Sequence, residues 1–149
     1  TDIHLAEARL KYFASGRETM RAMGALDAGG GHSDLEKRRV ELLRLRVSQI
    51  NSCAFCVDKH ASDAIKTGEQ PRCLSTLQVC HVVPFFSERE RAALEGSEAL
   101  TLIADAYVSE PRVKGQGGSR AIPFMDLSLA VNAVNAWNRF AIAFRKLTT

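Results

Sequence analysis

The sequence lacks the features that would connect it with a membrane or with nucleic acid. No run approaches the roughly 20 consecutive apolar residues that a membrane-spanning helix needs. Its 20 lysines and arginines are mixed with 17 aspartates and glutamates, and a net charge of +3 gives little support for a basic binding face. We therefore expect neither a membrane nor a nucleic-acid partner.

Cysteine is scarce as well, since four cysteines in 149 residues are too few for a disulfide scaffold. The first residues, Thr1 to His4, lack the basic and apolar regions of a secretory signal peptide. We expect a cytoplasmic protein, in which a close cysteine pair indicates redox or metal chemistry.

Sustained strand-like alternation is also absent, and helical periodicity takes its place. Apolar residues make up 46% of the chain and charged residues 25%, which is the balance of a folded globular protein. The length fits one domain over residues 1–149. We predict an all-α, single-domain bundle of about six helices.

Capping residues and helix breakers set the expected helix boundaries. Capping boxes at Ser33–Glu36 and Ser87–Glu90 open the second and fifth helices, and Ser52 is the expected N-cap of the third. Gly68 should end the third helix. Proline, glycine and basic residues predict a flexible loop over 109–123. The helices are expected over about 4–26, 34–50, 53–67, 72–82, 87–103 and 124–146.

The last expected helix is apolar nearly all round, with a polar edge only at Asn132, Asn135 and Asn138. A helix of this kind in a small domain must be central or be covered by another subunit. Trp137 on this helix is more typical of a core or interface residue than of a ligand platform. We therefore expect a homo-oligomer.

Cys53, Cys56 and His60 occupy positions i, i+3 and i+7 of one helix and so share a face. The first turn of a helix favours a thiolate, because it offers unpaired N–H groups and the positive end of the dipole. His60 lies one turn from Cys56, where it can act as a base. The pattern suits a thiol that a peroxide oxidises to a sulfenic acid and that a second thiol then captures as a disulfide.

A Cys-x-x-Cys pair alone fits redox chemistry, a zinc site or coincidence. The thioredoxin interpretation fails because that motif follows a β-strand, whereas a helix precedes it here. A zinc site would need further ligands, and the spacing of Cys73, Cys80 and His81 is irregular. Cys73 and Cys80 are more typical of small core residues. We expect no metal and no cofactor.

Three segments carry a resemblance to a known family. Glu41 precedes Cys53 by twelve positions, and the first segment, 45–56, ends with the cysteine pair. The other two segments are Pro84–Glu90 and Asn135–Phe140. Together these segments resemble the alkylhydroperoxidase D-like group of the carboxymuconolactone decarboxylase superfamily. The resemblance covers residues 34–145.

The resemblance implies an all-helical fold that assembles as trimers or hexamers, and a thiol-dependent peroxidase that takes electrons from a dithiol reductant. Glu41 matches the carboxylate of the proton relay, His60 its histidine, and Cys53 and Cys56 the redox pair. Because Cys56 is one turn from His60, we expect it to attack the peroxide. Cys53, at the more exposed helix end, is expected to resolve it and to meet the reductant. The opposite order stays open, since the helix dipole favours a thiolate at Cys53.

Phe55 departs from the family pattern, because the archetypal peroxidase has a second histidine at this place. The 109–123 segment departs too, where relatives continue with helix. Two other functions remain open on the same fold: a carboxymuconolactone decarboxylase-like enzyme, whose members do not depend on a cysteine pair, and a non-catalytic redox-sensing or binding protein.

Overall fold

The computed structural model describes residues 8–29, 37–105 and 121–148. Within these ranges the chain forms seven α-helices, one 3-10 helix and no strand, which confirms the all-α prediction. None of the helices there has the length and apolarity to cross a membrane. The elements are α1 (Tyr12–Ser15), α2 (Arg17–Gly29), α3 (Lys37–Ile50), α4 (Ala54–Lys66), α5 (Pro71–Ser75), η2 (Leu77–Val79), α6 (Glu88–Thr101) and α8 (Ala121–Ala143).

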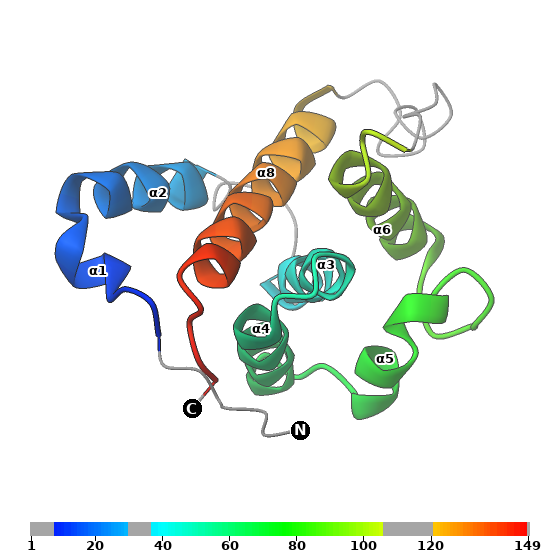
Figure 1. Cartoon of the computed structure of the whole chain (residues 1–149). Helices are drawn as coiled ribbons and strands as arrows, with labels where there is room; N and C mark the ends of the chain where they lie inside the picture. Colours follow the sequence, from blue (N-terminus) through cyan, green and yellow to red (C-terminus); the bar gives the residue numbers. More distant parts are fainter. Residues whose placement is uncertain (1–7, 30–36, 106–120, 149) are drawn as a thin grey trace.

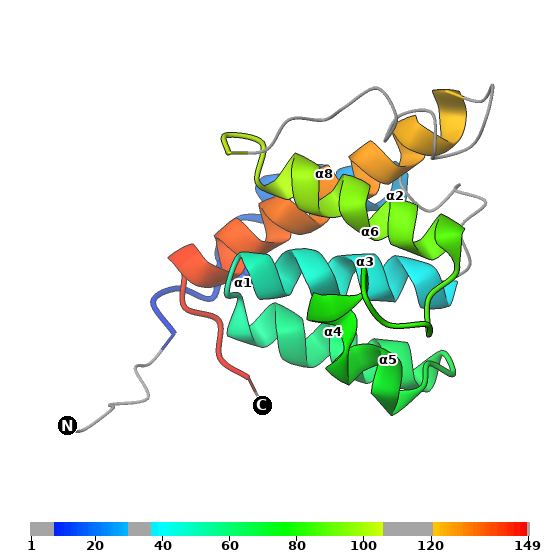
Figure 2. The ribbon, with the colours of Figure 1, turned by 90° about the vertical axis from the view of Figure 1, so that its right-hand side faces the viewer.

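Helix α3 lies at the centre of the bundle and contacts α4, α6 and α8 (Figure 1). Turned by 90°, the molecule shows α3 and α4 running side by side, with α6 above them (Figure 2). Helix α2 packs on the opposite side of α8. Burying an aliphatic side chain of the core contributes about 1.5–3 kcal/mol. The largest aliphatic side chains that are fully buried are Leu45, Leu77, Leu94 and Leu127.

The apolar C-terminal helix is central, as its composition predicts, because α8 lies between α2 on one side and α3 and α6 on the other. The asparagines of its predicted polar edge differ in exposure: Asn132 is exposed, whereas Asn138 is fully buried. Asn51, at the end of α3, donates from Nδ2 to Asn135 Oδ1 at 2.9 Å and to Asn138 Oδ1 at 2.8 Å. Asn138 in turn donates to Ser48 Oγ at 3.0 Å. These bonds fix the end of α3 against α8.

The single helix predicted over 4–26 is wrong in the described part. The chain turns at Gly16 between α1 and α2, and α2 continues to Gly29. The turn lets Tyr12 fold onto the end of α8, where its ring centroid lies 5.9 Å from that of Phe140 and 5.5 Å from that of Phe144. Burying Tyr12 to 6% exposure offsets the interruption of the helix.

The helix predicted over 72–82 is also wrong. After Pro71–Ser75 the chain continues as the short 3-10 helix Leu77–Val79 and then as turns. The Thr76 hydroxyl donates to the Arg72 carbonyl at 2.6 Å, and hydroxyls that bond nearby carbonyls compete with regular helix. The tighter turns bury both Leu77 and Cys80 completely.

The last helix begins at Ala121, three residues before the predicted start, and ends at Ala143 rather than Lys146. Pro123 is tolerated because it lies in the first turn, where backbone N–H groups have no partner within the helix. Some predictions fall on residues outside the described ranges. They are the rest of the loop predicted over 109–123, the capping box at Ser33–Glu36, and residues 4–7 of the first predicted helix.

Two boundary predictions are confirmed. Ser87 caps α6 in a reciprocal capping box, with Glu90 N–H donating to Ser87 Oγ at 3.1 Å and Ser87 N–H donating to Glu90 Oε2 at 2.7 Å. Helix α4 stops just before Gly68, whose φ of +93° is a conformation that glycine adopts without strain. Helix α6 ends at Thr101, two residues earlier than expected.

Candidate active site

A tight turn between α3 and α4 positions the two cysteines. The Cys53 N–H donates to the Ser48 carbonyl at 3.0 Å and the Ser52 N–H to the Gln49 carbonyl at 3.1 Å, the two bonds of a Schellman motif. Ser52 takes the left-handed position of that motif with a φ of 56°. The prediction that Ser52 caps the next helix is therefore wrong: Cys53 is the N-cap residue of α4, because Ser52 is used to terminate α3.

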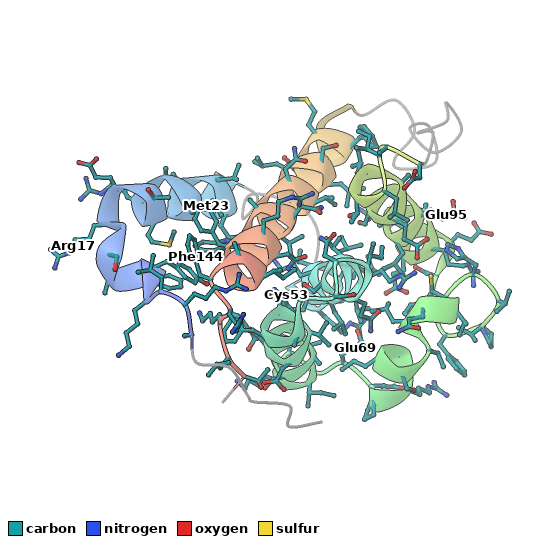
Figure 3. The ribbon with its side chains drawn as sticks, in the orientation of Figure 1. Arg17, Met23, Cys53, Glu69, Glu95 and Phe144 are labelled. Carbon is teal, nitrogen blue, oxygen red and sulfur yellow. A yellow bond between two sulfur atoms is a disulfide. The ribbon has the colours of Figure 1, made fainter. Side chains whose placement is uncertain are left out.

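Cys53 and Cys56 are joined by a disulfide, with their Cα atoms 5.3 Å apart. Figure 3 labels Cys53 where α3, α4 and the C-terminal end of α8 meet, and both cysteines pack there against Ala141. Cys53 is 1% exposed and Cys56 4%. The expectation that Cys53 is the more exposed thiol is wrong, because the end of α8 covers the first turn of α4.

A chain of hydrogen bonds leads away from His60, which is buried on α4. Its Nδ1 lies 2.8 Å from Oε2 of Glu41 on α3. The other oxygen of Glu41 accepts a bond of 2.9 Å from Arg44, which also donates to Asp27 of α2 at 3.1 Å. Burial by itself would raise the pKa of Glu41, but the hydrogen bond and charge of His60, with those of Arg44, outweigh burial and lower the pKa. Glu41 is thus an ionised carboxylate at neutral pH.

A carboxylate that accepts the Nδ1 proton fixes the neutral ring of His60 in one tautomer, with Nε2 as the basic nitrogen. The interaction joins residues that are 19 positions apart, through the packing of α3 against α4. This is the arrangement in which a carboxylate orients a histidine base.

Cys56 and His60 both line a cavity of about 200 Å³ between α1, α4 and α8, whereas Cys53 does not line it. Most of its wall is aromatic or aliphatic, and its charged groups come from α2, α3, α4 and the C-terminal segment. The other lining residues are Tyr12, Phe13, Asp27, Arg44, Phe55, Lys59, Val134, Trp137, Ala141 and Lys146.

The four residues singled out from the sequence, Glu41, Cys53, Cys56 and His60, therefore lie together. Sequence reasoning missed Arg44, although its position three residues after Glu41 on one helix is a signal for an ion pair. It also missed Asp27 and Lys146, for which spacing along the chain gives no signal.

Two groups in the described part of the chain could offer three metal ligands each. Cys80, His81 and Glu98 form one group, and Glu41, His60 and Asp63 the other, with the ligand atoms in each group within 4.8 Å of one another. Cys73, considered from the sequence as a further ligand, belongs to neither group.

Other interactions oppose a cation at both places. Glu98 is bound to Arg46 at 2.7 Å, and burial raises the pKa of the Cys80 thiol and so disfavours the thiolate that a metal needs. In the second group Glu41 is paired with Arg44, and Asp63 is paired with Lys59.

Residues 17–99 match the family model described as the Carboxymuconolactone decarboxylase family, and this range holds all four candidate site residues. The uncharacterized protein YdfG of Bacillus subtilis (strain 168) is 37% identical over 138 residues, which cover 91% of this chain and 92% of YdfG.

Solved structures show the same fold. A protein of unknown function from Agrobacterium tumefaciens, described as a candidate AhpD antioxidant defence protein, has a TM-score of 0.88 and 31% identity, covering 96% of this chain and 99% of its own. A peroxidase-related protein from Ralstonia eutropha JMP134, described as an alkylhydroperoxidase AhpD core, has a TM-score of 0.79 at 20% identity, over 91% of this chain and 73% of its own. A third, a peroxidase-related protein from Silicibacter sp. TM1040, has a TM-score of 0.74 at 21% identity, over 100% and 91%.

Proposed function

The chain belongs to the carboxymuconolactone decarboxylase family, and within it we propose that this protein is a thiol-dependent peroxidase that reduces hydroperoxides through Cys53 and Cys56. One observation carries the proposal: Cys56 of the disulfide-forming pair and the Glu41-bound His60 line the same cavity. The AhpD-like description of the Agrobacterium relative points the same way.

The proposed cycle starts from the dithiol form. His60 accepts the proton of the Cys56 thiol, and the thiolate attacks the terminal oxygen of the hydroperoxide, so that an S–O bond forms as the O–O bond breaks. The departing alkoxide takes a proton from His60 and leaves as an alcohol. The Cys53 thiol then attacks the sulfenic acid sulfur of Cys56, which forms the disulfide and releases water.

A dithiol reductant closes the cycle. Its first thiolate attacks the disulfide, its second thiol completes the exchange, and the reductant leaves as a disulfide while both protein thiols are restored. The two electrons that reduced the peroxide thus come from the reductant. Since Cys56 lines the cavity and Cys53 is covered, we place the first attack of the reductant at Cys56.

The same difference between the two cysteines indicates which thiol attacks the peroxide and which resolves the sulfenic acid. Cys56 lines the cavity on the helix that also carries His60, whereas Cys53 is packed against Ala141. This favours Cys56 as the attacking thiol and Cys53 as the resolving thiol. Phe55 offers no proton, so the proposed relay consists of His60 and Glu41 alone.

We also propose that the protein acts as a homo-oligomer, a trimer or a hexamer. Large apolar side chains remain exposed outside the cavity, among them Val82 at 83%, Ile103 at 67% and Met125 at 66%. Contiguous exposed apolar surface is typical of subunit contacts, and we propose that these side chains take part in such contacts. Light scattering at micromolar concentration checks this proposal, and a clean monomer would contradict it.

Steady-state reduction of cumene hydroperoxide with dihydrolipoamide as the dithiol tests the proposed function. Cys56→Ser should abolish turnover, and His60→Ala should slow it by roughly a hundredfold or more. In the absence of the dithiol, Cys53→Ser should react with one equivalent of peroxide and stop at the sulfenic acid of Cys56, which dimedone traps. Cys73→Ala, which removes a buried thiol outside the cavity, is the matched control and should keep turnover. A native protein that forms its disulfide with peroxide but does not turn over would contradict the enzyme and favour a redox sensor.

A further inference from the structure

Lys146 reaches the cavity by a turn at the end of α8. Arg145 has a left-handed φ of 53°, and the Lys146 N–H donates to the Ala141 carbonyl at 2.8 Å, which folds the chain back on the helix end. Its Nζ then lies 4.0 Å from the centroid of the Phe55 ring and 4.6 Å from that of Phe13. The ammonium therefore stands over the residue next to Cys56.

This ammonium has no carboxylate partner within residues 8–29, 37–105 and 121–148, since its contacts there are with aromatic rings. The other cations of the cavity are paired: Lys59 with Asp63, and Arg44 with two carboxylates. Burial first, and repulsion from Lys59 second, lower the pKa of Lys146. A bound anion would relieve that repulsion and compensate for lost hydration.

The rest of the cavity is suited to an apolar molecule. Phe13 and Trp137 stack with centroids 5.8 Å apart, and Val134 and Ala141 extend this wall. Asp27 is the one carboxylate in the described lining, and its charge is met by Arg44. The volume of about 200 Å³ equals that of roughly seven liquid waters, which suits a compact organic molecule.

We propose that the cavity selects a hydroperoxide carrying a carboxylate, with an apolar aliphatic or aromatic body between the carboxylate and the peroxide. Lys146 binds the carboxylate, the aromatic wall holds the body, and the peroxide meets Cys56. This inference rests on the proposed function and adds the class of substrate. Hydrogen peroxide would use neither the ammonium nor the wall, and a neutral alkyl hydroperoxide would leave the ammonium without a partner.

Binding can be measured separately from turnover by tryptophan fluorescence, because Trp137 is the only tryptophan and lines the cavity. The probes are 4-(2-hydroxypropan-2-yl)benzoate, the alcohol that a carboxylated cumene hydroperoxide yields, and its methyl ester. We expect the carboxylate to bind about tenfold or more tightly than the ester, as a charge-assisted hydrogen bond implies. Lys146→Met should remove this preference, and Lys146→Arg should keep it.

Lys66→Met is the matched control, because that lysine is exposed and paired with Asp63 outside the cavity, and it should keep the preference. Equal affinity of the native protein for acid and ester, or an unchanged preference in Lys146→Met, would overturn the inference.

Turnover of 4-(2-hydroperoxypropan-2-yl)benzoate and its methyl ester separates the two proposals. A lower KM for the acid, raised about tenfold by Lys146→Met with little change in kcat, supports the inference. Equal kcat/KM for acid and ester in an active enzyme would overturn the substrate class while the peroxidase stands. No turnover of either compound, with carboxylate binding that depends on Lys146, would overturn the peroxidase while the anion site stands.

Discussion

Glu41→Gln is the most informative single change, because it removes the charge and nearly keeps the shape of a buried side chain. Glu41 now accepts one bond from His60 Nδ1 and one from Arg44. In the variant the amide oxygen can still accept from Arg44, but the amide NH₂ cannot accept the proton of His60. Arg44 also keeps its bond to Asp27, so the main loss is the one charge-assisted bond between residue 41 and His60.

Hydrogen bonds to charged groups contribute about 1.5–3 kcal/mol, and we expect the free energy of unfolding to fall by that amount at neutral pH. The pKa of Glu41 is lowered from its ordinary value of 4.5. Its stabilising contribution is therefore fully present above pH 4.5 and is lost as the pH falls through the lowered pKa of the folded state. The difference between native protein and variant should shrink over that acidic range.

Urea unfolding of both proteins, followed by circular dichroism at neutral pH and at several values below 4.5, measures this difference. Glu95→Gln is the control, since Glu95 is 43% exposed and its replacement should change stability by less than about 0.5 kcal/mol. A Glu41→Gln difference that is absent at neutral pH, or that stays constant into the acidic range, would refute the reasoning. In the peroxidase assay the variant should also be slower, because the ring of His60 loses its orientation.

Three further changes test the fold around the site. Ser52→Gly should raise the free energy of unfolding by about 0.5–1 kcal/mol, since glycine adopts the left-handed conformation without strain. Urea unfolding measures this change, and a loss of stability would contradict this account. Asn138→Ala should cost about 1–3 kcal/mol, because it leaves the buried Ser48 hydroxyl without this donor and takes one acceptor from the half-buried Asn51. The exposed Asn132→Ala should cost less than about 0.5 kcal/mol, and similar costs for the two variants would show that the buried bonds contribute little. Burial raises the pKa values of the Cys73 and Cys80 thiols, so both should resist iodoacetamide in the folded oxidised protein and react on unfolding. Mass spectrometry measures the labelling, and labelling of either thiol in the native state would contradict their burial.

The sequence was sufficient for features that depend on a few neighbouring residues. Helical spacing alone places Cys53, Cys56 and His60 on one face, because that geometry is local. The capping box at Ser87–Glu90 and the stop at Gly68 follow from local hydrogen bonding and backbone freedom, and the structure has both. The asparagines of the last helix marked a polar edge, but only the structure separates the buried Asn138 from the half-buried Asn135 and the exposed Asn132.

Local signals failed where two uses of a residue competed. Ser52 has the side chain of an N-cap, yet it terminates the preceding helix, because the short connection between α3 and α4 has room for one turn only. Residues 4–26 were predicted as one continuous helix, yet the chain bends at Gly16, because Tyr12 gains contacts with the end of α8. No window of neighbouring residues contains those distant partners.

The sequence by itself thus determined the helical class, the thiol pair with its histidine, and the family to which the chain belongs. Only the tertiary structure decided which thiol lines the cavity, how Glu41 reaches His60, and that Lys146 stands over Phe55. The physical reason is that these contacts join residues 19 to 91 positions apart. They exist only once α1, α3, α4 and α8 have packed around a common core.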